Sequence, residues 1–72
     1  MLDFETRMLS GEPFTMEELK RAFSKNENEA RKIERRVREF QHLGYIKLQR
    51  QQLRVIWVAT DLGKAKLDEE QR

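Results

Sequence analysis

The sequence contains no cysteine and only one histidine among its 72 residues. A chain without cysteine forms neither disulfides nor thiolate metal sites, and one histidine is too few for a histidine metal cluster. No apolar run approaches the ~20 residues that cross a bilayer, and no signal-peptide pattern opens the chain. We therefore expect a cytoplasmic protein that has no metal, no small-molecule cofactor and no membrane partner.

The features of common catalytic sites are also missing. No glycine-rich phosphate loop joins a strand to a helix. There is no cysteine nucleophile, and His42 has no evident serine and aspartate partners. Of the two carboxylate pairs, Glu17-Glu18 opens a predicted helix and Glu69-Glu70 lies in the polar tail, so neither resembles a buried acid-base couple. We expect no enzymatic activity.

Charge is what the sequence has in abundance, at 39% of its residues, and it is distributed unevenly. Residues 1–30 carry four Lys/Arg and seven Asp/Glu, a net charge of −3. Residues 31–54 carry eight against two, a net of +6, and residues 55–72 carry three against four, a net of −1. A basic middle segment between acidic ends suits a polyanionic partner, although a solvated charged helix has the same composition.

The basic segment begins in the clearest helical pattern of the chain, residues 28–43, which contains neither glycine before its end nor proline. Its apolar side chains recur at steps of three and four, at Ala30, Ile33, Val37 and Phe40. Residues so spaced form one stripe of an α-helix. The opposite face carries polar and charged side chains, namely Asn28, Arg31, Lys32, Arg35 and Glu39. Arg36 and Arg38 lie on the flanks, so the helix buries one side and presents cations on the other.

Two shorter helices precede this segment. Residues 2–9 predict the first, with Asp3 as its N-cap. The second covers residues 16–23 and begins with the Thr-x-x-Glu spacing of a capping box, from Thr15 to Glu18. Its expected buried side chains are Met16, Leu19, Ala22 and Phe23. A short polar turn then leads into the long helix, a spacing typical of a helix-turn-helix.

After the long helix the pattern changes from helical to alternating. Residues 45–49 and 53–59 are rich in β-branched and aromatic side chains and predict two antiparallel strands. Residues 50–52 include no glycine or asparagine to favour a tight turn, so we expect a longer, mobile hairpin tip. A last helix follows a cap supplied by Thr60 or Asp61. Its expected inward side chains are Leu62, Ala65 and Leu67.

The order helix, helix, helix, strand, strand, helix predicts a single α+β domain over residues 1–72. A two-stranded hairpin is marginal alone, so it must pack against the helices, as in a winged helix. Residues 14–67 resemble the winged helix-turn-helix DNA-binding superfamily. The resemblance rests on three segments: Thr-Met-Glu-Glu-Leu at 15–19, Val-Arg-Glu-Phe-Gln-His-Leu-Gly-Tyr-Ile at 37–46, and Thr-Asp-Leu-Gly at 60–63.

Within this superfamily the first segment resembles the opening of the second helix, and the middle segment resembles a recognition helix that leads into the wing. The third resembles the Thr-x-x-Gly segment after the wing of MarR-like and PadR-like regulators. The chain is shorter than those regulators and lacks their dimerisation helices. It looks more like a small phage, plasmid or archaeal regulator.

The resemblance implies a protein that binds specific sequences of double-stranded DNA and regulates transcription, as a homodimer and associated with the nucleoid if prokaryotic. The helix at residues 28–42 would enter the major groove, and the wing at residues 49–54 would contact the backbone or minor groove. Arginine and asparagine suit this role because they bind guanine and adenine, respectively, through two hydrogen bonds. The candidate DNA-binding residues are Asn28, Arg31, Lys32, Arg35, Arg36, Arg38, Arg50, Gln51, Gln52 and Arg54.

These residues could also serve the fold alone, without any contact to DNA. Three acid-base pairs lie four residues apart and could pair along the helix, namely Glu27–Arg31, Glu34–Arg38 and Arg35–Glu39. That would leave Lys32, Arg36, Arg50 and Arg54 without an obvious local partner. For Trp57 we expect core packing under the wing rather than stacking on a base. The alternative functions are a winged-helix module for protein–protein interaction and an architectural or replication DNA-binding protein.

Overall fold

The computed structural model describes residues 2–71, and in this range it shows four helices and two strands. In chain order these are α1 (Asp3–Met8), α2 (Met16–Phe23), α3 (Glu27–Leu43), β1 (Ile46–Gln51), β2 (Arg54–Ala59) and α4 (Asp61–Glu70). The predicted order of elements and the α+β class are confirmed; residues 1 and 72 of the predicted domain lie outside the described range. No helix within residues 2–71 is both long enough and apolar enough to cross a bilayer.

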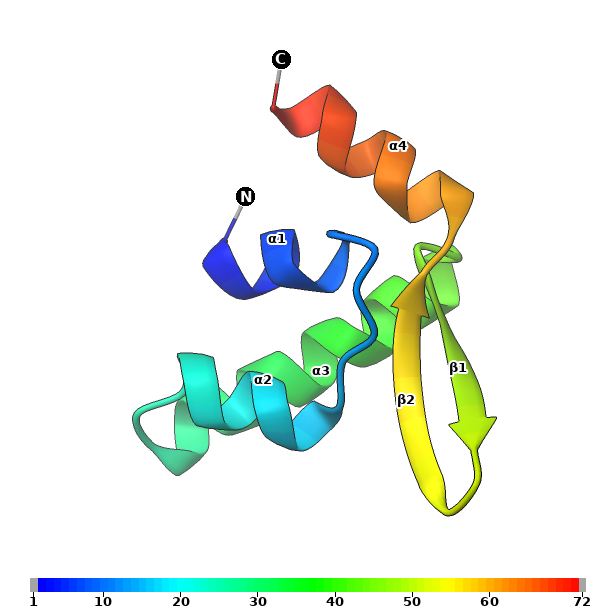
Figure 1. Ribbon diagram of the computed structural model, residues 1–72. Coiled ribbons are helices and arrows are strands. Elements are labelled where there is room, and N and C mark those ends of the chain that lie inside the picture. Colours follow the sequence, from blue (N-terminus) through cyan, green and yellow to red (C-terminus); the bar gives the residue numbers. More distant parts are fainter. Residues whose placement is uncertain (1, 72) are drawn as a thin grey trace.

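The three N-terminal helices lie to one side of the hairpin, and α4 follows at the hairpin's base (Figure 1). They enclose one apolar interior, whose most buried members are Met8, Leu9, Phe14, Leu19, Ile33, Val37, Phe40 and Ile46. The predicted stripe of α3 is confirmed, since Ile33, Val37 and Phe40 are at most 3% exposed. Ala22 was expected to be buried with Leu19 and is instead exposed. The arrangement is compatible with a winged helix.

Side-chain caps define where the helices begin. The Thr15 hydroxyl accepts a hydrogen bond from the Glu18 amide at 3.1 Å, as the Thr-x-x-Glu spacing predicts. The prediction for α1 is wrong, because its N-cap is Leu2 and not Asp3. The Glu5 carboxylate instead reaches back to accept the Leu2 amide at 3.1 Å. The leucine side chain at the N-cap cannot accept a hydrogen bond, so the carboxylate of Glu5 in the first turn satisfies a free backbone amide at this end of α1.

The hairpin is tighter than the sequence predicts. The two strands pair in register from Ile46 opposite Ala59 to Gln51 opposite Arg54, which leaves only Gln52 and Leu53 in the turn. The expected longer tip at residues 50–52 is therefore wrong. Gln52 adopts φ +55°, a left-handed conformation that glycine or asparagine favours. Continuing the ladder to its last pair outweighs the local cost of this conformation, about 1–3 kcal/mol.

An isolated β-bridge joins Phe14 to the outer edge of β2. The Phe14 amide donates to the Trp57 carbonyl at 3.0 Å, and the Trp57 amide donates to the Phe14 carbonyl at 2.8 Å. This pair joins the segment before α2 to the hairpin, which the sequence does not reveal. Trp57 is partly buried and packs against the core, so the expectation of core packing is confirmed.

The inward face of α4 differs from the prediction. Leu62 and Ala65 are exposed, whereas Gly63 is buried and Leu67 packs against the core. A Cβ atom on Gly63 would lie 2.1 Å from the Tyr45 carbonyl oxygen. Because α4 approaches the start of β1 so closely, its inward face must centre on the residue without a side chain. With Gly63 at the centre of the buried face of α4, the neighbouring Leu62 points outward.

Candidate nucleic-acid interface

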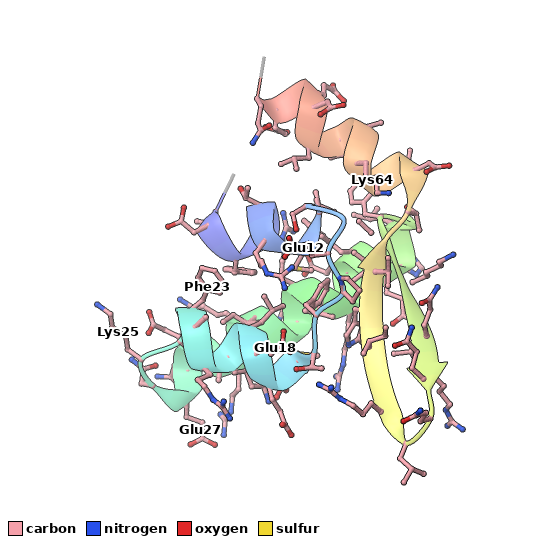
Figure 2. All side chains as sticks on the ribbon, in the orientation of Figure 1. Glu12, Glu18, Phe23, Lys25, Glu27 and Lys64 are labelled. Atoms are coloured by element: carbon pink, nitrogen blue, oxygen red, sulfur yellow. The ribbon has the colours of Figure 1, made fainter. Side chains whose placement is uncertain are left out.

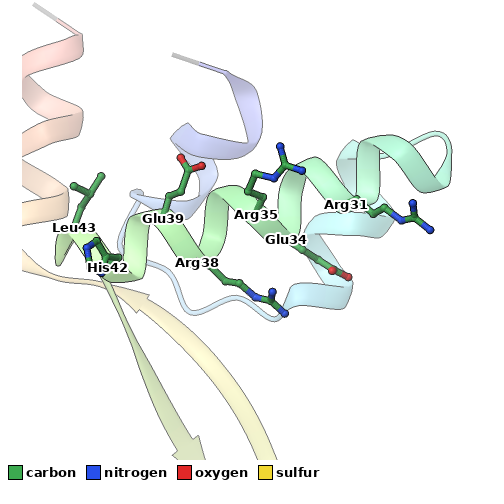
Figure 3. A pocket seen from close by; sticks show the side chains of 7 residues that line it. All are labelled: Arg31, Glu34, Arg35, Arg38, Glu39, His42 and Leu43. Atoms are coloured by element: carbon green, nitrogen blue, oxygen red, sulfur yellow. The ribbon is translucent and has the colours of Figure 1, made fainter.

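The outer face of α3 presents a row of side chains to solvent (Figure 3). Four exposed residues of this row lie three or four positions apart in the sequence, namely Arg31, Arg35, Arg38 and His42. Figure 3 shows that Arg38 and Glu34 point to the side on which the hairpin extends, whereas Arg35 and Glu39 point to the other side. The cations of α3 therefore cover the width of its outer face.

The two acids of the basic segment are engaged elsewhere. Glu34 pairs with Lys20 of α2, and this hydrogen bond and charge lower the pKa of the Glu34 carboxyl. Glu39 accepts from Arg36 at 2.6 Å. The alternative pairs Glu34–Arg38 and Arg35–Glu39 therefore do not form, and within residues 2–71 Arg35 and Arg38 have no carboxylate partner.

The third of these possible pairs is present. Arg31 Nη2 lies 3.3 Å from Glu27 Oε1, with the two side chains 68% and 80% exposed. An ion pair so open to solvent contributes only about 0.3–0.5 kcal/mol, so Arg31 can leave it for another anion at little cost. Asn28 and Lys32, which lie in the same turns of α3, are also exposed.

Arg36 is held in the fold by contacts that its local sequence does not reveal. Its Nε donates to Glu5 Oε2 at 2.5 Å, and the Glu5 side chain is only 6% exposed. The guanidinium also lies 4.9 Å from the centre of the Phe40 ring, a cation–π geometry. The hydrogen bonds to Glu5 and then to Glu39 raise the pKa of Arg36. Since Glu5 is 31 residues away, the sequence alone left Arg36 apparently unpartnered.

The hairpin carries the other half of the candidate set. Its exposed polar and charged residues and the residues of its turn are Lys47, Arg50, Gln51, Gln52, Leu53 and Arg54. The chain from residue 40 to residue 60 contains no aspartate or glutamate. No salt bridge joins a hairpin cation to an acid anywhere in the described chain. Lys47 and Leu53 were not among the predicted DNA contacts. The net charge of residues 31–54 includes Lys47 and could have indicated it, whereas Leu53 is neither basic nor polar and nothing in the sequence indicated it.

Acidic residues limit this surface at the start of α2. A cleft of about 540 Å³ separates that end of α2 from the hairpin, and its lining includes Glu17, Arg54 and Trp57. Glu18 lies beside a neighbouring depression that also contacts Arg54. Phosphates placed over Glu17 and Glu18 would meet carboxylates, so the basic surface consists of α3 and the hairpin and does not continue onto α2.

The structure thus brings most of the predicted residues to exposed positions on two consecutive elements. Such a surface can neutralise phosphates and offer arginine and amide donors to base edges. Among the known proteins, no family model, no curated sequence and no solved structure matches this chain.

Proposed function

We propose that this protein is a winged-helix protein that binds double-stranded DNA, with α3 in the major groove and the hairpin against the backbone or minor groove. The observation that carries the proposal is a set of exposed cations that no carboxylate within residues 2–71 neutralises. These unpaired cations are Lys32, Arg35 and Arg38 on α3 and Lys47, Arg50 and Arg54 on the hairpin.

The distribution of acids supports DNA as the partner. A solvated charged helix gains stability from pairs along its own surface. In α3, Glu34 bonds instead to Lys20, which joins α2 to α3, and Glu39 bonds within the helix to Arg36, whose guanidinium also reaches Glu5 of α1. The cations that remain form no salt bridge within the described residues. Phosphates would give them an anionic partner and release the counterions of the DNA.

The proposal is tested with the double variant Arg35→Ala/Arg38→Ala. The control is Lys64→Ala/Lys66→Ala, which removes the same formal charge from α4, where Lys66 pairs with Glu70 at 3.0 Å. Lys64 lies at the hairpin's base, away from its tip (Figure 2). Affinity for duplex DNA is measured against salt concentration. Each lost phosphate contact lowers the slope of log affinity on log salt by about 0.9, so the test variant should lose roughly twice that. Its thermal unfolding should match the parent's, because neither arginine pairs within the described chain.

The control variant should keep the parent's slope. If the Arg35→Ala/Arg38→Ala variant binds DNA as the parent does, α3 is not the recognition helix.

A second experiment separates a sequence-specific regulator from an architectural protein. It selects the sequences that the protein binds from random duplexes at near-physiological salt. A shared inverted repeat supports a dimeric regulator, since a two-fold dimer reads two half-sites about one helical turn apart. Binding without a shared sequence supports an architectural role.

A second candidate, a protein-interaction module, is favoured by one face of the hairpin. Leu48 pairs across the strands with Trp57, and Val55 lies on the same face. Leu48 is 44% and Val55 46% exposed, so this apolar face is only half covered. A partner that bound here would be lost on Leu48→Ser and retained in the Arg35→Ala/Arg38→Ala variant.

A further inference from the structure

The tip of the hairpin exposes an entire leucine side chain. Leu53 is 102% exposed, the largest value among the exposed large apolar residues of the described chain. Burial of a leucine is worth about 1.5–3 kcal/mol, and the fold gains none of it here. The turn does not require leucine either, because two-residue turns favour glycine, asparagine and aspartate. Leu53 therefore contributes nothing to the fold that a polar residue would not.

The surroundings of Leu53 indicate what it can contact. Arg54 follows it directly, and Arg50 lies opposite Val55 within the same end of the hairpin. Gln51 and Gln52 add amide donors, and no acid occurs between residues 40 and 60. Glu17 of α2 lines the cleft on one side of Leu53, whereas the hairpin itself supplies only cations and amides. An apolar point beside such cations and amides suits a polyanion that also offers an apolar interior. A lone surface leucine is ordinary, but this combination is the chemistry of a DNA base stack bordered by phosphates.

The geometry of the hairpin suits insertion. The ladder continues to the Gln51–Arg54 pair, so the turn is short and its two residues are held by paired strands. The hairpin extends past the helices at the end opposite α4, so its tip is the leading point of the molecule on that side (Figure 1). A turn held in this way loses little backbone freedom when it enters a groove, so only the rotamers of the leucine side chain remain to be fixed.

We propose that Leu53 wedges between two base pairs from the minor groove and kinks the duplex, while Arg50 and Arg54 hold the phosphates on either side. This inference rests on the proposed DNA binding and adds to it a mechanism of deformation. Apolar wedges of this type unstack a step and bend DNA by roughly 20–90°. Flexible TA and CA steps are the easiest to open, so the site should contain one where the tip lands.

The experiment compares the parent with Leu53→Ala and with Leu53→Met, which keeps an apolar wedge. The control is Leu62→Ala, which shortens another exposed leucine, 55% accessible and located on α4. The duplex carries a donor and an acceptor dye at its ends and a 2-aminopurine at the central TA step. Energy transfer reports bending, 2-aminopurine fluorescence reports unstacking, and the salt dependence of affinity reports phosphate contacts.

The parent, Leu53→Met and Leu62→Ala should all bend the duplex and brighten the 2-aminopurine. Leu53→Ala should lose both signals and keep the salt slope, because no charge has changed. If Leu53→Ala bends DNA as the parent does, or if the parent binds DNA and leaves it straight, the wedge is refuted and DNA binding stands. If the parent binds no duplex at any salt concentration, the proposed function fails and the wedge fails with it.

Discussion

At the scale of single residues, Gly63 shows how packing can reverse an intrinsic preference. In an exposed helix, replacing glycine with alanine stabilises the helix by about 1 kcal/mol. Here an added Cβ would lie 2.1 Å from the Tyr45 carbonyl oxygen and 3.0 Å from a Leu9 methyl. Neither a backbone carbonyl nor a fully buried leucine can withdraw easily, so the collision decides the sign.

We therefore predict that Gly63→Ala destabilises the protein by about 1–3 kcal/mol, the usual cost of overpacking. Urea unfolding followed by circular dichroism measures the change. Asp68→Ala, at an exposed position of α4, is the control and should stay within about 0.5 kcal/mol of the parent. A Gly63→Ala variant that is as stable as the control would mean that α4 does not approach Tyr45 this closely.

For the charged residues Glu5 and Arg36, too, contacts between distant parts of the chain decide the role of the side chain. The Glu5 carboxylate accepts both the Leu2 amide and the Arg36 guanidinium, so one buried acid caps α1 and fixes α1 to α3. Local spacing indicated neither contact. Arg36 consequently has a role in the fold, unlike Arg35 and Arg38 beside it, although all three look alike in the sequence.

At the scale of elements, Thr60 connects three parts of the chain. Its hydroxyl donates to the Gly44 carbonyl at 2.5 Å and accepts the Gly63 amide at 3.1 Å. Its own amide donates to the Tyr45 carbonyl at 2.9 Å. The end of α3, the start of β1 and the N-terminus of α4 are thus joined through one residue. The Thr-x-x-Gly segment therefore acts structurally, with threonine as the cap and glycine at the close approach.

The contact between α2 and α3 should depend on pH. Lys20 lowers the pKa of Glu34 below its ordinary value of 4.5. A carboxyl whose pKa is lower in the folded than in the unfolded state stabilises the fold above pH 4.5, and this contribution disappears as the pH falls through the lowered value. We predict that, as the pH falls from neutral to below 4.5, the melting temperature of Glu34→Gln decreases less than that of the parent.

Melting temperatures measured across this pH range test the prediction. Glu12→Gln is the matched control, because no salt bridge joins Glu12 to a cation in the described chain; it should follow the parent. The Lys20–Glu34 contact has no influence on stability if the parent and Glu34→Gln curves run parallel throughout.

The elements themselves were largely predictable, and their detailed contacts were not. The 3.6-residue period of α3 and the Thr15 cap are local signals, so the helices were placed within a few residues. The two-residue turn at Gln52 was missed because strand pairing, and not the turn sequence, determines its length. The bridge between Phe14 and Trp57 was missed because pairing between distant segments leaves no local pattern.

At the scale of the whole molecule, the candidate site was predictable because it is nearly contiguous in sequence. Residues 31–54 hold most of the positive charge, and they form α3 and the hairpin, which follow one another directly. Which cations remain unpaired could not be predicted, since Lys20 and Glu5 reach α3 from other helices. The resulting molecule has a basic surface supported by α1 and α4, which are mildly acidic, and by α2, whose charges balance.

The same connections determine how the molecule unfolds. A two-stranded hairpin is marginal alone, but this one is joined to the helices through the Phe14–Trp57 bridge and through Thr60. We predict that the hairpin and the helices unfold together in one transition. Trp57, the single tryptophan, packs against the core and reports on the hairpin, whereas far-UV circular dichroism reports mainly on the helices. In urea the two signals should share one midpoint and a slope of about 1 kcal/mol/M, as for small proteins. A tryptophan transition at lower urea would mean that the hairpin opens independently, and the hairpin would then be a mobile arm and not a rigid one.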